Sequence, residues 1–182
     1  MPIAQLPTYG MIVREDWLNP DHIPEGTQYD GEYIYDTLEE RFGREKAQEL
    51  LNLFYDGWIT EWDLDNIKEK GFNCVRVPFW YRNFYYDDKG TKILDENGEW
   101  DFSRLDWVVE ECRERGLYVI LDMHGAVGSQ SDAPHSGRGY GGAQLYAQNA
   151  QGEEYRRLTK ELWTAIAERY KDNDTIIAYS LV

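Results

Sequence analysis

The chain has 182 residues, and 19 Lys and Arg against 34 Asp and Glu give it a formal net charge of −15 at pH 7. Its 7 Trp, 14 Tyr and 6 Phe exceed what a disordered acidic segment carries, so we expect one folded domain with a core. Such an acidic surface repels phosphate groups, which argues against nucleic acid and anionic membranes as partners and leaves neutral ligands.

The first 32 residues contain closely spaced Pro and Gly and one short apolar run, residues 11–13, which predicts a short strand. This segment lacks the basic and apolar regions of a secretory signal, so we expect a cytoplasmic protein if Met1 is the native start. The chain has no run of about 18 apolar residues, so we expect no membrane span.

Helical periodicity appears in several segments. Apolar residues recur at helical spacing over residues 33–56, with Gly43 as an interruption. Residues 60–63 have the form of a capping box and predict the start of a second helix, which we expect to end at residues 70–71. Asp101 is expected to cap a third helix, whose apolar face runs to residue 112.

Three apolar segments predict strands. Residues 72–77 form a β-branched run that we expect to end before Pro78, because proline cannot donate to a strand ladder. Residues 117–122 are typical of a buried parallel strand, and residues 175–182 predict another. A further amphipathic helix over residues 155–166 completes an alternation of strands and helices, which predicts an α/β fold with a parallel sheet.

Cysteine spacing predicts no metal centre and no disulfide framework. Cys74 and Cys112 both lie in apolar segments, where buried free thiols are expected. Asp122 and His124 have no third ligand at a suitable spacing, so we expect them to act as hydrogen-bonding groups. We therefore expect neither a metal nor another cofactor.

Candidate site residues lie where the predicted strands end, because ligands of parallel α/β folds bind at the carboxyl ends of the strands. Arg76 either pairs with a structural acid or holds a catalytic carboxylate with its planar guanidinium. His124 follows Asp122 and is either structural or directed at a ligand, which Gly125 would allow to approach the backbone.

An aromatic segment, residues 79–86, follows the strand predicted over residues 72–77. It has two interpretations. The rings either cover the helix layer as a hydrophobic lid, or Trp80 or Tyr81 stacks on the apolar face of a sugar ring.

Four segments in the same order resemble glycoside hydrolase family 5, most closely its exo-β-1,3-glucanase branch. They are residues 13–17, 57–63, 71–78 and 121–130, with Ser136 and Gly137 following. The resemblance covers nearly the whole chain. It implies a (β/α)₈ TIM barrel that hydrolyses β-glycosidic bonds with retention, with one Glu as acid/base and another as nucleophile about 5–5.5 Å apart.

The resemblance also implies roles for individual residues. Arg76 matches the arginine that orients the nucleophile, and His124 matches the histidine that hydrogen-bonds the bound glucosyl unit. Glu15 matches an acidic residue that contacts sugar hydroxyls. Further candidates for substrate binding are Trp80, Tyr81, Asp122 and His135.

On this resemblance residues 1–182 form a partial barrel domain, the N-terminal half with about strands one to four, which ends just before the strand-four motif that carries the acid/base Glu. The nucleophile belongs to the seventh strand, and a full barrel needs about 250 residues. We therefore expect the chain to lack both catalytic Glu and to be inactive without a C-terminal half, supplied in cis or as a second chain. Its expected ligand is a neutral β-glucan or oligosaccharide.

Two alternatives remain open. The chain could be a non-catalytic glycan-binding or interaction module built on a half barrel, although an exposed sheet edge argues against this. The substrate could be β-1,4-glucan or β-mannan, because members of the family share the Arg and the His and differ in their loops. His135 stands where the glucanase branch tends to have Asn, which bears on the sugar and the linkage. A nucleotide-binding fold is disfavoured, because the Gly-rich residues 137–142 adjoin no strand as a phosphate loop would.

Overall fold

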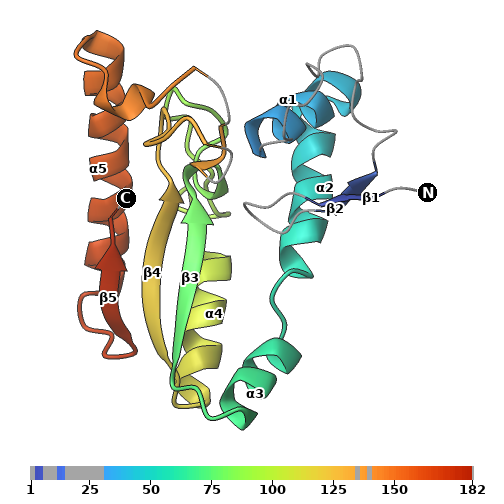
Figure 1. The fold of residues 1–182 in the computed structure, drawn as a ribbon, viewed down its shortest axis with the longest axis vertical. Coiled ribbons are helices and arrows are strands. Elements are labelled where there is room, and N and C mark those ends of the chain that lie inside the picture. The colour runs from blue at the N-terminus through green and yellow to red at the C-terminus, as the bar shows by residue number, and fades with distance from the viewer. Residues whose placement is uncertain (1–2, 6–11, 15–30, 134–135, 139–140, 182) are drawn as a thin grey trace. The chain divides into compact units, whose positions relative to one another are not determined.

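The computed structural model of the protein describes residues 3–5, 12–14, 31–133, 136–138 and 141–181. The chain divides into two compact units (Figure 1). Unit 1 comprises Met1–Trp58 and Ser131–Ala143, and unit 2 comprises Ile59–Gln130 and Gln144–Val182. Among the described residues, no helix is long and apolar enough to cross a membrane.

Unit 1 contains two short strands and two helices. Strand β2 (Ile12–Arg14) begins one residue later than predicted and pairs antiparallel with β1 (Ile3–Gln5) in a two-stranded sheet. Helices α1 (Gly31–Phe42) and α2 (Arg44–Asp56) replace the single interrupted helix that periodicity indicated. They separate at Gly43, whose φ of 78° lies in the left-handed region that a helix cannot accommodate. Their facing apolar side chains form a small core of Ile34, Tyr35, Leu38, Ala47 and Leu51.

Unit 2 is built on a three-stranded parallel sheet in the order β3-β4-β5. Its elements in chain order are α3 (Glu61–Glu69), β3 (Cys74–Trp80), the 3₁₀ turn η3 (Tyr81–Asn83), α4 (Ser103–Glu114), β4 (Tyr118–Gly125), the 3₁₀ turn η5 (Gln144–Tyr146), α5 (Ala150–Tyr170) and β5 (Ile176–Ser180). The parallel sheet of the described chain therefore has three strands. The segment that the resemblance makes the first barrel strand contains β2, which pairs antiparallel with β1 in unit 1 and is not part of the parallel sheet.

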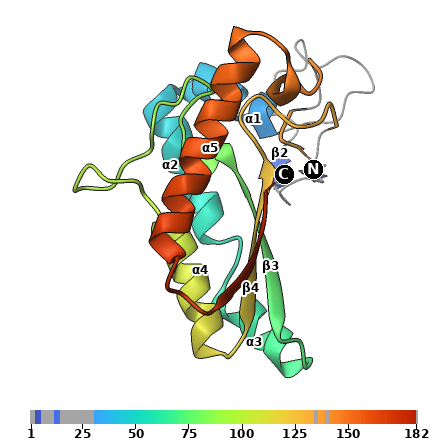
Figure 2. The same cartoon turned by 90° about the vertical axis from the view of Figure 1, so that its left-hand side faces the viewer.

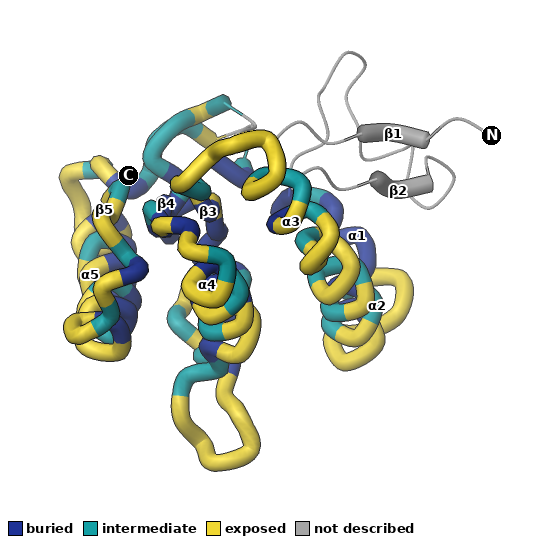
Figure 3. Tube along the Cα trace, turned by 90° about the horizontal axis from the view of Figure 1, so that it is seen from below, coloured by how far each residue is buried: buried dark blue, intermediate teal, exposed yellow. Residues whose placement is uncertain are grey.

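The two faces of this sheet have different surroundings. Helices α4 and α5 cover one face (Figure 2), and the residues directed toward them are buried, among them Val77 and Phe79 of β3 and Leu121 of β4. On α4 and α5 buried and exposed positions alternate around the helix (Figure 3), as expected for amphipathic helices packed on a sheet. Side chains alternate along a strand, so Arg76 and Asp122 lie on the opposite face.

The strand prediction at Pro78 was wrong. Strand β3 continues through Pro78 to Trp80, and Pro78 is in register with Asp122 of β4. Within the three-stranded sheet β3 is an edge strand that pairs only with β4. An edge strand tolerates proline because the missing N–H can face away from the ladder.

Helix boundaries follow local chemistry closely. The capping box of α3 is confirmed, since the Thr60 backbone amide donates to Asp63 Oδ2 at 2.9 Å, and the helix ends before Gly71. Helix α4 begins after Phe102, one residue later than a cap at Asp101 implies. The Asp101 carboxylate nevertheless accepts a hydrogen bond from the Ser103 amide at 3.0 Å, so it satisfies one amide of the first turn.

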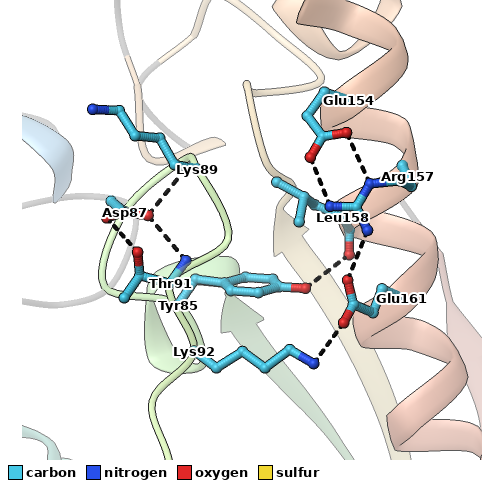
Figure 4. A network of polar contacts seen from close by, with 9 residues as sticks. All are labelled: Tyr85, Asp87, Lys89, Thr91, Lys92, Glu154, Arg157, Leu158 and Glu161. Atoms are coloured by element: carbon cyan, nitrogen blue, oxygen red, sulfur yellow. Dashed lines mark hydrogen bonds and ion pairs between the residues drawn. The ribbon is translucent and has the colours of Figure 1, made fainter.

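Polar contacts fasten the segment between β3 and α4 to helix α5 (Figure 4). The Tyr85 hydroxyl donates to the Leu158 carbonyl oxygen at 3.2 Å, and Lys92 Nζ pairs with Glu161 Oε1 at 2.6 Å. Burial, together with the negative charge of Glu161, raises the pKa of Tyr85 above its ordinary range. Tyr85 therefore stays protonated and remains a donor throughout the neutral range.

Helix α4 is joined to α5 by one carboxylate. Asp106 Oδ1 accepts hydrogen bonds from Arg169 Nε and from the Tyr170 hydroxyl, both at 2.7 Å. The guanidinium of Arg169 also lies over the Phe102 ring, 5.2 Å from its centroid. These contacts fix the relative position of the two helices that cover the sheet.

Both cysteines have free thiols, as predicted, although Cys74 is only partly buried. Burial raises the pKa of Cys112 to about 11. Because the folded chain holds this proton more tightly than the unfolded chain, the contribution of Cys112 to stability is complete below about pH 9 and declines as the pH rises toward 11.

Replacing Leu162 on α5 with Ala should lower the free energy of unfolding by about 2–5 kcal/mol, because the side chain is fully buried beneath the sheet and its removal leaves a cavity. The matched control is Leu94→Ala, where the side chain is about half exposed and the expected change is about 0.5 kcal/mol or less. Urea denaturation followed by tryptophan fluorescence measures both. Equal losses in the two variants would contradict the assigned core.

A second experiment tests the burial of Cys112. In a Cys74→Ser chain at pH 8, we expect iodoacetamide to label Cys112 only after urea is added, because a thiol with a pKa of about 11 has little thiolate at that pH. Mass spectrometry counts the label. Rapid labelling of the folded chain, without loss of its circular dichroism, would show that Cys112 is accessible.

Candidate active site

Three of the predicted site residues meet at the sheet face opposite the helices. Arg76 lies on β3, and Asp122 and His124 lie two residues apart on β4. The parallel register aligns Arg76 with Ile120 and Pro78 with Asp122, so the two strands end at the same edge of the sheet. Side chains two residues apart on a strand share a face, which directs all three groups to one side.

Asp122 is the centre of this cluster. Its Oδ2 atom lies 2.7 Å from Arg76 Nη2 and 3.0 Å from His124 Nδ1. The same Nδ1 atom lies 3.3 Å from Arg76 Nη2, so the tautomer decides its partner: with its hydrogen on Nδ1 the ring donates to the Asp122 carboxylate, which only accepts hydrogen bonds when ionised. In a neutral ring of that tautomer, Nε2 is left as an acceptor.

Burial differs sharply among the three side chains. The Asp122 side chain is 3% exposed, whereas Arg76 is 53% and His124 is 30% exposed. A buried carboxylate is tolerated only when a cation and hydrogen-bond donors compensate its lost hydration, and Arg76 and His124 supply both. The two donors remain open to solvent, so a ligand can reach them although it can hardly reach Asp122.

Gln130 is a residue of this region to which the sequence analysis gave no role. Its Nε2 atom donates to the His124 carbonyl oxygen at 2.8 Å, and its Oε1 atom accepts from the Ala126 amide at 3.0 Å. The turn before it has positive φ at Gly128 and at Ser129, 74° and 62°. The adjacent Gly and Ser were the available signal for such a turn, but not for the bonds that Gln130 makes.

Trp80 and Tyr81 do not join this cluster. Trp80 and Tyr81 are buried, with 3% and 2% exposure, and their ring centroids lie 5.5 Å apart in an edge-to-face contact. Neither ring offers an open face to a sugar in this structure, which favours the interpretation of the aromatic segment as packing. Glu15 and His135 lie outside the described residues.

In the part of the chain that the structure describes, no three His, Cys, Asp or Glu side chains are grouped as metal ligands. The groups that the cluster offers to a ligand are hydrogen-bond donors and acceptors and the charge of Arg76. The cluster can hold an anionic or hydroxyl acceptor at Arg76 and a hydroxyl donor at His124.

Comparison with known proteins identifies relatives. The profile of the cellulase family, glycosyl hydrolase family 5, matches residues 43–182. The chain is 30% identical over 164 residues to a beta-xylosidase of Phanerodontia chrysosporium, which covers 90% of this chain and 33% of that protein. It is 33% identical over 176 residues to probable glucan 1,3-beta-glucosidase A of Aspergillus clavatus, which covers 95% of this chain and 39% of that protein. The chain thus spans between 33% and 39% of the length of these two relatives.

Among solved structures, the endoglucanase Cel5A of Pseudomonas stutzeri superposes on 67% of this chain and 32% of its own, with 17% sequence identity and a TM-score of 0.47.

The charge of Asp122 is tested by Asp122→Asn, which keeps the shape of the side chain. We expect a loss of about 1–3 kcal/mol in the free energy of unfolding, because the buried site loses two charge-assisted hydrogen bonds. Asp172→Asn, at an exposed position, is the control and should change stability little. If urea denaturation gives the same midpoint for Asp122→Asn and the unsubstituted chain, the cluster does not depend on the carboxylate charge.

Proposed function

Because the chain belongs to glycosyl hydrolase family 5, the cellulase family, we propose that it forms part of the active site of a retaining β-glucan hydrolase. The observation that carries this proposal is the cluster of Arg76, Asp122 and His124, in which Arg76 of β3 reaches Asp122 and His124 near the carboxyl-end edge of the sheet. That is the edge at which parallel α/β folds bind their ligands.

Arg76 is proposed to orient the nucleophilic carboxylate. Its contact with Asp122 Oδ2, 2.7 Å away, holds one end of the guanidinium in place. The side chain is still half exposed, so the planar group can accept a second carboxylate in the two-point geometry that arginine favours. A carboxylate held in this way stays ionised, as a nucleophile must.

His124 is proposed to bind a hydroxyl of the sugar. In this proposal Nδ1 donates to Asp122 Oδ2, which orients the ring and leaves Nε2 as the acceptor. Asp122 is thus proposed to act through its two neighbours, because its own side chain is almost completely buried. A neutral ring that accepts from a hydroxyl suits an uncharged substrate, which the acidic chain does not repel.

The two catalytic carboxylates are proposed to come from outside residues 1–182. Retention requires a nucleophile and an acid/base about 5–5.5 Å apart and open to the substrate. Asp122, the carboxylate of the cluster, is buried and already engaged by two donors, so it is unsuited to either role. In this proposal β3, β4 and β5 are the second to fourth strands of a (β/α)₈ barrel, and the face with Arg76 lines its interior.

The substrate is proposed to be a β-1,3-glucan. Several relatives are named as glucan 1,3-beta-glucosidases, at 29–33% identity. Another relative is named as a beta-xylosidase, and the experiment below compares substrates for that reason. Glu15 and His135 stay proposed contacts to the sugar, as implied by the family resemblance.

The decisive measurement is hydrolysis of laminarin and of an aryl β-glucoside, with carboxymethylcellulose and β-mannan as competing substrates. We expect no turnover by the 182-residue chain alone. We expect turnover of laminarin when the chain is fused to the C-terminal part of a glucan 1,3-beta-glucosidase relative that follows its matched region. In that fusion Arg76→Ala should abolish turnover, whereas Arg104→Ala at the outer surface of α4 should not.

Each other result has a definite meaning. Turnover by the chain alone would overturn the proposal that the catalytic carboxylates lie elsewhere. Binding of laminarin by the chain, with no turnover by a folded fusion, would favour a glycan-binding module. A fusion that prefers carboxymethylcellulose or β-mannan would replace the proposed substrate.

A further inference from the structure

His124 occupies an irregular position in the sheet. The register of β3 with β4 pairs Phe79 with Met123 and Trp80 with Gly125, so it passes over His124. On the other side, the register of β4 with β5 ends at Asp122. His124 is therefore the extra residue of a β-bulge, a feature that re-aims a side chain and disrupts the ladder locally.

The Gln130 side chain engages the backbone on both sides of this bulge. It donates to the carbonyl of His124 at 2.8 Å and accepts from the amide of Ala126 at 3.0 Å. A single residue of a parallel neighbouring strand would bond the same two groups, one carbonyl and the amide two residues later. A carboxamide can replace that residue because it carries one donor and one acceptor, as a peptide group does. The Gln130 carboxamide thus takes the place of a strand neighbour where the regular pairing is interrupted.

Gln130 is itself held by a rigid turn. The Ser129 amide donates to the Ala126 carbonyl oxygen at 2.9 Å, and the Ser129 carbonyl oxygen accepts from the Leu145 amide at 3.0 Å. Residues 126–129 are buried, which leaves the turn little freedom to move. The Gln130 side chain that contacts the bulge therefore extends from a turn that is bonded within itself and to Leu145.

We propose that Gln130 is a positioning residue that holds the bulge at His124 and thereby sets the contact of the imidazole with Asp122. The proposal rests on the proposed function only for the use of His124 in sugar binding. The contact itself exists in the free chain, with Nδ1 3.0 Å from Asp122 Oδ2. It can therefore be measured without any hydrolysis.

The measurement is the ¹⁵N and ¹H NMR spectrum of the imidazole in the 182-residue chain. The chain has three His, and the changes His22→Gln and His135→Gln leave His124 as the single ring. We expect the unsubstituted site to show the Nδ1–H tautomer, with a proton that exchanges slowly with water. Gln130→Met, which keeps the length of the side chain but removes both hydrogen bonds, should shift the ring nitrogen resonances and abolish the slow exchange.

Two further variants separate positioning from a general loss of stability. Gln130→Glu loses the donor to His124 and keeps the acceptor for Ala126, so we expect a folded chain with a smaller shift of the ring signals. Gln148→Met is the matched control, because Gln148 makes an exposed side-chain bond to the Tyr146 carbonyl oxygen, and it should leave the ring signals unchanged.

A double-variant cycle with Asp122→Asn completes the test. If Gln130 acts through the His124–Asp122 contact, Gln130→Met should no longer move the ring signals once Asp122 is Asn. The proposal is overturned if Gln130→Met lowers the melting temperature while the ring signals stay in place. It is also overturned if both Gln130 variants lose their dispersed amide spectra, since Gln130 would then be a determinant of folding.

Discussion

One buried oxygen atom organises the candidate site. Asp122 Oδ2 is contacted by Arg76 from the neighbouring strand and by His124 from its own strand. A carboxylate in this position is stable only while both donors stay close, so the need to compensate one charge fixes two side chains that remain partly exposed. The parallel pairing of β3 with β4 makes this possible, because it brings the two strand ends to one edge.

Local signals in the sequence predicted local structure well. The capping box of Thr60 and Asp63 and the apolar stripe of α5 are contained within one or two turns of chain, and both were confirmed. Features that depend on residues distant in the chain were harder to predict from the sequence. Pro78 is tolerated within β3 because of its place at a sheet edge, which no local pattern encodes. The aromatic segment was recognised, but whether Trp80 is covered depends on the packing of the whole unit.

The same division applies to the site. The alternation of strands and helices placed Asp122 and His124 near the end of β4, whereas Arg76 lies inside β3, because that strand continues to Trp80. Their common contact depends on the register of β3 with β4, which brings Arg76 to Asp122 although the two residues lie 46 positions apart in the chain. Gln130 is the clearest case, because its bonds to the backbone exist only after the bulge and the following turn have formed.

Pro78 has a consequence for the open edge of β3. Whatever chain segment lies along that edge meets a peptide group with no hydrogen to give, at the level where Asp122 sits on the next strand. A neighbouring backbone carbonyl at that height must find its donor in water, in a side chain or in a bound molecule. The edge thus carries a fixed gap in its hydrogen-bonding pattern beside the charged cluster.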